Sequence, residues 1–218
     1  MEQLLTTNIA VNLYWFGRHM ERIEVTLVDI LALFDVVIDT DKEAGRRYFD
    51  LLGIDLEYED ASQFLDNAIF GEHSGNLADI MSNARENAII CRSQIDADAF
   101  GETIKLYQFF DHASKSAVYV DYRFVDEALS LLNEIRGILS RGLVRRKSDH
   151  FIRLGRLVEK VDLYLRHGQD GEESAKYLNN ILTTAQEINP EIGLAISVED
   201  EEANLDAINT LIDRLVVE

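Results

Sequence analysis

The sequence has few of the residues that build disulfides and irregular loops. Its 218 residues include one cysteine, Cys91, and one proline, Pro190. A single cysteine excludes an internal disulfide and a cysteine-based zinc cluster, and such low cysteine usage is typical of a reducing cytoplasm. Because proline is poorly tolerated inside helices and common in loops, its near absence favours long helices with short connections.

Positive charge is also scarce, since 21 Lys and Arg stand against 40 Asp and Glu, a formal net charge of −19. Nucleic-acid binding needs cations to replace the counterions of phosphates, so this balance argues against it. The absence of any run of about 18 apolar residues excludes a membrane span. The N-terminus lacks the basic start and small-residue cleavage site of a secretory signal. We expect one cytoplasmic domain over residues 1–218.

Helical periodicity dominates what is present. A 4-3-4-3-4-3-4 apolar spacing predicts one long helix with an apolar stripe of Ile9, Leu13, Phe16, Met20, Ile23, Leu27, Ile30 and Phe34. We expect its N-cap within residues 6–8 and its end within residues 39–41. Further helices are predicted over residues 60–70, 76–96, 102–112, 121–140, 148–166, 171–189 and 202–217. Ser148 or Asp149 is the expected cap of the helix over 148–166. No pair of alternating, β-branched segments is joined by a tight turn. The fold class is therefore all-α, a multi-helix bundle.

The segment near residues 13–27 is repeated near 151–165. The two share a GRxxE pentapeptide, in which Gly17, Arg18 and Glu21 align with Gly155, Arg156 and Glu159. The flanking apolar positions align as well, and so do the pairs Arg22 with Lys160, Glu24 with Asp162 and Leu27 with Leu165. Two long helices therefore have equivalent roles, as a pseudo-twofold axis would give them.

The charged residues of this repeat lie on a helix face that is otherwise apolar, so we expect them inside the bundle. A buried charge needs a partner, and a glycine within a helix indicates a close crossing. The hypothesis is that the two helices cross near their glycines. Arg18 then faces Glu159, and Arg156 faces Glu21.

Three interpretations of these buried charges remain open. They form an ion-pair network that fixes the register of the helices, or they line a polar binding cleft. The third is a dinuclear metal site on Glu21, Glu24, Glu159 and Asp162. Di-iron carboxylate proteins use Glu-x-x-His, which this chain lacks, and the arginines would repel a cation. We therefore predict no metal.

A middle motif, Asn83 to Asn87, places Arg85, Glu86 and Asn87 on one helix, with Arg92 two turns from Arg85. With Ser82, the two arginines offer a site for a carboxylate or phosphate. Alternatively, Arg85 pairs with a glutamate of a GRxxE helix and completes its network.

Basic residues concentrate between residues 136 and 156, where seven basic residues and one acid give a local net charge of +6. Such a concentration attracts an anion, or it marks a basic turn that docks an acidic partner. The acidic run 199–202 is interpreted as a solvated loop or helix start. Neither GxGxxG nor GxxxxGK[ST] occurs, so we predict no nucleotide loop and no cofactor on this chain.

The segments NLYWFGRHMERIE, NARENAIICRSQI and FIRLGRLVEKVD resemble, in this order, the three signature segments of the bacterial Alpha-E family. This family is all-helical and its function is poorly defined. The chain departs from it at Glu159-Lys160 and Asp162, where Glu-Arg and a second Glu are usual. It also has Asp98-Ala99-Phe100 where an acidic-x-Trp step is common, and typical members are longer.

The resemblance implies a partner, because such domains are encoded beside or fused to ATP-grasp-like and transglutaminase-like proteins. The leading hypothesis is a helical binding or accessory protein of an amide-forming or peptide-modifying system, with an anionic small molecule or peptide in its cleft. The candidate cleft residues are Arg18, Glu21, Arg22, Glu24, Arg85, Glu86, Asn87, Arg92, Arg156, Glu159 and Asp162. The alternatives are a stand-alone enzyme that uses paired carboxylates for amide ligation or hydrolysis, and a purely structural helical oligomer.

Overall fold

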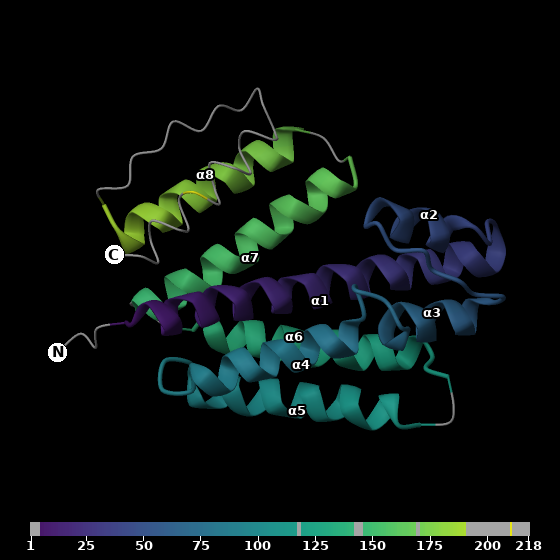
Figure 1. Ribbon diagram of the computed structural model, residues 1–218, viewed down its shortest axis with the longest axis horizontal. Helices are drawn as coiled ribbons and strands as arrows, with labels where there is room; N and C mark the ends of the chain where they lie inside the picture. The colour runs from purple at the N-terminus through teal and green to yellow at the C-terminus, as the bar shows by residue number, and fades with distance from the viewer. Residues whose placement is uncertain (1–4, 117–118, 142–145, 169–170, 191–209, 211–218) are drawn as a thin grey trace.

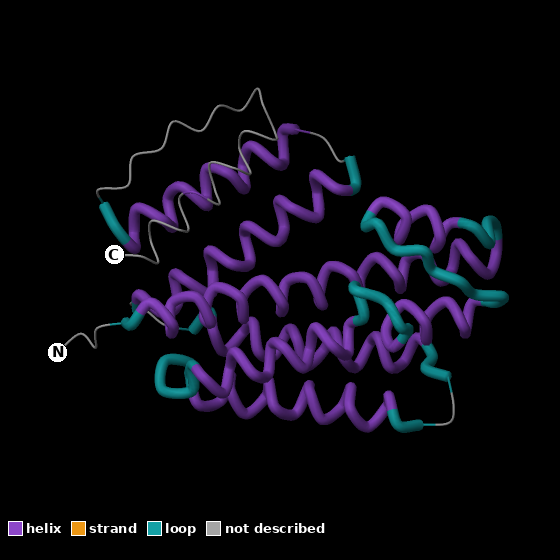
Figure 2. Tube along the Cα trace, in the orientation of Figure 1, coloured by secondary structure: helices purple, strands orange, loops and turns teal. Residues whose placement is uncertain are grey.

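The computed structural model describes residues 5–116, 119–141, 146–168, 171–190 and 210. Over these residues it has no strand, and its helices (Figure 1; Figure 2) are α1 (Thr7–Asp39), α2 (Ala44–Leu51), α3 (Ala61–Phe70), α4 (Leu77–Ile90), α5 (Ala97–Ser114), α6 (Tyr122–Leu139), α7 (Lys147–Arg166) and α8 (Gly171–Ile188). The predicted all-α fold is confirmed. None of the helices described here has an apolar stretch that could cross a membrane.

Helix α1 is the axis of the molecule. Its 33 residues correspond to about 50 Å of helix. Figure 1 shows α7 and α8 on one side of it and α4, α5 and α6 on the other. The long apolar stripe explains this position, because Leu13, Phe16, Ile23, Leu27 and Ile30 are all fully buried. The helix starts as predicted, with the Thr6 hydroxyl accepting a hydrogen bond from the Ile9 amide, and it is capped at Thr40.

The helix predicted over residues 76–96 is shorter, and residues 91–96 form a turn between α4 and α5. Asn76 caps α4, which ends at Ile90, and α5 begins at Ala97. The Asp96 carboxylate caps α5 by accepting from two backbone amides of its first turn. Cys91 and Ile95 in the connection are buried. Their positions continue the apolar spacing of α4, so the predicted helix extends past the true end of α4.

The structure differs from the predictions at two further helices. The sequence does not predict α2, because its eight residues have no side-chain cap. Phe49 anchors this helix in the core. Neither Ser148 nor Asp149 caps α7. The helix begins one residue earlier, and the Asp149 carboxylate accepts from the backbone amide of Arg146 instead. Of the helix predicted over 202–217, only Thr210 is among the described residues, and it is helical.

Candidate functional site: two reciprocal ion-pair clusters and a basic cavity

The two repeated helices, α1 and α7, cross in backbone contact at their glycines. A Cβ atom built on Gly155 would lie 2.9 Å from the carbonyl carbon of Tyr14 and closer still to its oxygen. A Cβ on Gly17 would lie 3.0 Å from the carbonyl carbon of Ile152. Real Cβ atoms do not come this close to backbone, so only glycine permits the crossing at both positions.

On one side of the crossing, the carboxylates of α7 bind guanidinium groups of α1. We call Glu159, Asp162, Arg18, Arg22 and Arg166 the Glu159 cluster. The Nε of Arg18 donates to Glu159 at 2.6 Å and its Nη2 to Asp162 at 3.0 Å. Arg22 also donates to Glu159, and Arg166 donates to Asp162 at 3.1 Å. Glu159 is only 1% exposed, so its charge depends on these guanidinium groups.

On the other side, the carboxylates of α1 bind cations of α7 and α6. We call Glu21, Glu24, Arg156, Lys160 and Arg136 the Glu21 cluster. The Nε of Arg156 donates to Glu21 at 2.7 Å, and its Nη2 lies 3.6 Å from Glu24. The Nη2 of Arg136 donates to Glu24 at 2.8 Å. The Nζ of Lys160 stays 4.0 Å from Glu21. The predicted contacts, Arg18 with Glu159 and Arg156 with Glu21, are thus both confirmed.

Burial and neighbouring charges compete in both clusters. Burial opposes the charged form of Arg18, but the carboxylates of Glu159 and Asp162 outweigh it, so the pKa of Arg18 is raised above its usual value. For Glu24 burial prevails over the attraction of Arg136, and its pKa is raised. Burial also raises the pKa of Tyr14, beside Arg18, to about 12. Arg18 therefore stays charged and Tyr14 stays protonated near neutral pH.

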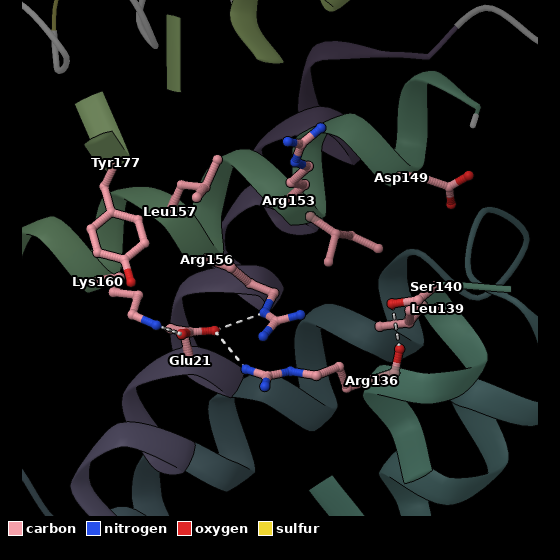
Figure 3. A pocket seen from close by; sticks show the side chains of 11 residues that line it. Glu21, Arg136, Leu139, Ser140, Asp149, Arg153, Arg156, Leu157, Lys160 and Tyr177 are labelled. Atoms are coloured by element: carbon pink, nitrogen blue, oxygen red, sulfur yellow. Dashed lines mark hydrogen bonds and ion pairs between the residues drawn. The ribbon is translucent and has the colours of Figure 1, made fainter. Parts of the chain in front are cut away.

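A cavity of about 260 Å³ opens beside the Glu21 cluster (Figure 3). Helix α7 lines it over three turns with Asp149, Ile152, Arg153, Arg156, Leu157 and Lys160. The end of α6 contributes Arg136, Leu139 and Ser140, while α1 contributes Glu21 and α8 contributes Tyr177. Four of these side chains are basic and two are acidic, so the cavity is positively charged overall. Three of the seven basic residues of segment 136–156 lie in this lining. Part of the basic segment therefore surrounds the cavity.

The basic side chains of the cavity are only partly engaged. Arg153 lies 3.5 Å from Glu187, and Lys160 stands 4.9 Å above the ring of Tyr177. The buried Nε of Arg136 has no hydrogen-bond partner among the described residues. Sequence reasoning missed Tyr177, because an aromatic residue on the apolar stripe of α8 is not distinguishable from a core residue.

Most of the middle motif does not join this site, contrary to the interpretation that Arg85 pairs with a glutamate of a GRxxE helix. Arg85 pairs with Glu86 on its own helix and lies 4.8 Å from the ring of Tyr107 in α5. Arg92 lies 5.1 Å from the ring of Phe100. Among the described residues, neither arginine has an ion pair with α1 or α7, so the predicted cleft between three helices is wrong for Arg85, Glu86 and Arg92.

Asn87 connects the middle motif to α1 by side-chain hydrogen bonds. Its amide nitrogen donates to the side-chain oxygen of Asn12 at 2.8 Å, and its oxygen accepts from the Nδ1 of His19 at 3.0 Å. Burial lowers the pKa of His19, which favours its neutral form. This amide therefore fixes the register of α4 against the helix that carries Arg18 and Arg22.

The four carboxylates considered for a dinuclear metal site do not converge. Glu21 and Glu24 belong to one cluster, Glu159 and Asp162 to the other, and arginines neutralise each pair. Among the residues that the structure describes, no three His, Cys, Asp or Glu side chains gather where they could hold a metal ion.

Comparison with known protein families identifies a match. A family model described as a predicted alpha-helical domain with a conserved ER motif covers residues 5–190. No curated protein and no solved structure matches the chain. The chain has one Glu-Arg dipeptide, Glu21-Arg22. Its two side chains enter different clusters, Glu21 meeting Arg156 and Arg22 meeting Glu159, so this dipeptide spans the crossing.

Proposed function

Since the chain belongs to the Alpha-E family, we propose that it is a helical binding or accessory protein whose cavity holds an anionic group. The family description names a helical domain and a motif but no activity. The geometry of the Glu21 cluster and its cavity therefore carries the proposal.

The main support is how the charges around the cavity are exposed. The side chains of Arg136, Arg153, Arg156 and Lys160 are between 24% and 40% exposed, whereas that of Glu21 is 4% exposed. The remaining acid, Asp149, accepts from the backbone amide of Arg146 at one end of the cavity. Positive groups thus face the open space, and a negative group that enters meets several donors at once.

The ligand class follows from the chemistry of these donors. A guanidinium group presents a planar fork that matches a carboxylate or a phosphate. Leu139, Ile152 and Leu157 supply an apolar wall for the body of the ligand. Pockets for drug-sized ligands start at about 300 Å³. A cavity of about 260 Å³ suits a small anion or the end of a chain.

The biological role we propose is in an amide-forming or peptide-modifying system. The resemblance to the Alpha-E family suggests an ATP-grasp-like or transglutaminase-like partner. The nucleotide then binds to the partner, because this chain has no phosphate-binding loop motif. A carboxylate or acyl phosphate awaiting amide formation has the charge and size that the cavity accepts.

Stand-alone catalysis by Glu21 and Glu159 is less well supported. The two carboxylates lie in different clusters, and guanidinium groups bind both. A general base must reach the proton it abstracts. These side chains, 4% and 1% exposed, face their own arginines instead.

Calorimetric titration tests the anion site. The probes are inorganic phosphate, N-acetylalanine and N-acetylalanine amide, which lacks the charge. We expect the two anions to bind and the amide not to bind. Arg153→Gln should weaken anion binding by about tenfold, the effect of losing about 1.4 kcal/mol. Its contact with Glu187 is long and partly exposed, so the fold should tolerate the change.

The matched control is Arg123→Gln. Arg123 lies in the first turn of α6, and among the described residues it pairs with the nearby Asp121. It should bind the anions as the wild type does. If no anion binds, or if the amide binds as well as the acid, the anion site is wrong. The partner role fails separately if a neighbouring ATP-grasp-like protein has the same turnover with and without this chain.

A further inference from the structure

A partly exposed face of α1, which includes two arginines of the Glu159 cluster, combines an aromatic ring with cations. Trp15, Arg18, His19 and Arg22 follow one another at spacings of three, one and three residues, so they share one side of the helix. We call these four residues the Trp15 face. Trp15 is 41% exposed, an unusual position for the chain's single tryptophan.

Neighbouring contacts hold the Trp15 face in place. The guanidinium of Arg18 lies 5.1 Å from the centre of the indole ring. The imidazole of His19 lies 5.7 Å from the same ring, tilted by 32°, and is itself hydrogen-bonded to Asn87 of α4. A side chain already held in one geometry loses little entropy when something binds to it.

The charge of this face is positive at the surface. Three guanidinium groups stand over two carboxylates in the Glu159 cluster. Glu159 is 1% exposed, whereas the side chain of Arg22 is 34% exposed. Glu159 and Asp162 take three hydrogen bonds from Arg18 and Arg22, whose forks carry five N–H groups each. Donors therefore remain for an additional acceptor.

In the repeat, the Trp15 face of α1 corresponds to the face of α7 that lines the cavity. The positions equivalent to Trp15, Arg18, His19 and Arg22 are Arg153, Arg156, Leu157 and Lys160, which all line the cavity. The helix pair thus carries two cationic faces. One forms the wall of a hollow, and the other presents a flat aromatic ring.

We propose that the Trp15 face is a docking surface for an acidic segment of a partner protein. Side-chain carboxylates of the segment bind Arg18 and Arg22, and an apolar side chain packs on the indole. Tryptophan and arginine are the residues that most often carry the energy of a protein interface. Because the chain is acidic overall, with a net charge of −19, recognition comes from these contacts rather than from long-range attraction.

This inference does not depend on the anion cavity, and one peptide tests it. The probe is a short blocked peptide of alternating glutamate and leucine. Its counterpart has glutamine in place of glutamate. Trp15 is the only tryptophan, so its fluorescence reports contact at this face directly. We expect the glutamate peptide to change the emission of Trp15, the glutamine peptide not to do so, and added salt to weaken the binding.

Three variants localise the binding. Arg22→Gln should raise the Kd of the glutamate peptide by about tenfold, and Arg22→Lys, which keeps the charge but loses the fork, by a smaller factor. Arg153→Gln in the cavity should leave the Kd unchanged. Circular dichroism checks the fold, and Arg22→Lys serves as the test if Arg22→Gln does not fold. The proposal is overturned if the glutamine peptide binds equally, if the emission of Trp15 does not respond, or if Arg153→Gln is the variant that loses binding.

Discussion

Replacing Gly155 with alanine gives the sharpest test of the helix crossing. In most helix interiors this change stabilises a protein by about 1 kcal/mol, because glycine is a poor helix former. Here the new Cβ would lie 2.9 Å from the carbonyl carbon of Tyr14 and 3.0 Å from the amide nitrogen of Arg18. Both are backbone atoms, so no side-chain rotation relieves the clash. Helices α1 and α7 must separate by about 1 Å or move along each other.

The cost has two parts. Overpacking of a close contact costs about 1–3 kcal/mol. Separation of the helices also stretches the ion pairs on both sides of the crossing, Arg18 with Glu159 at 2.6 Å and Arg156 with Glu21 at 2.7 Å. Complete rupture of such a buried pair costs about 3–5 kcal/mol, and a partial loss costs a fraction of that. After subtraction of the gain in helix propensity, we expect a net loss of about 3 kcal/mol.

Thermal unfolding measures this loss. For a chain of this size, a loss of about 3 kcal/mol lowers the Tm by about 6–12 °C. The control is Gly101→Ala in α5, where a Cβ would meet nothing within 4 Å. That variant should gain up to about 1 kcal/mol. Gly17→Ala should behave like Gly155→Ala, since the contact is reciprocal. A Gly155→Ala variant as stable as the Gly101→Ala control would refute the backbone contact.

Two more variants test the buried groups. Glu159→Gln removes the charge that Arg18 and Arg22 share, and we expect the free energy of unfolding, measured in urea, to fall by about 3–5 kcal/mol; an unchanged midpoint would contradict the buried pairing. Burial lowers the pKa of His167 in the folded state below 6.5. As the pH falls below about 6.5, the unfolded chain therefore binds more protons than the folded chain, and the folded state loses stability. His167→Phe keeps a ring against Tyr48, which His167 stacks on at 4.5 Å, and should reduce the fall in Tm below about pH 6.5. Equal pH dependence of this variant and the wild type would exclude His167 as a cause.

The crossing could be predicted because the sequence contains both halves of it. A glycine inside each of the two helices marks where the two backbones approach. Once Gly17 lies against α7 and Gly155 against α1, helical periodicity brings the residues one turn away to the partner helix. The contacts of Arg18 with Glu159 and of Arg156 with Glu21 follow from spacing alone.

The middle motif has no such internal partner in the sequence, and for that reason the predicted pairing of Arg85 with a glutamate of a GRxxE helix is wrong. Periodicity shows that Arg85 and Arg92 share a face of a helix, but not which neighbour that face meets. The face of α4 that contacts α1 carries Asn87, whereas Arg85 lies against Tyr107 of α5. The buried apolar face of α4 and the two hydrogen bonds of Asn87 therefore lie toward the core, and the arginines lie away from α1.

The position of the cavity depends on residues outside the repeat. Arg22 and Lys160 are equivalent in the alignment, yet Arg22 donates directly to Glu159, while Lys160 stays 4.0 Å from Glu21 and faces the ring of Tyr177. A lysine has no fork with which to bind the carboxylate from that distance. Arg136 of α6 supplies the missing guanidinium from the far wall, so the Glu21 cluster is neutralised across a gap rather than along one helix. The repeat predicts two charge clusters, but the cavity at Glu21 also depends on α6, which packs on α1, and on α8, which packs on α7.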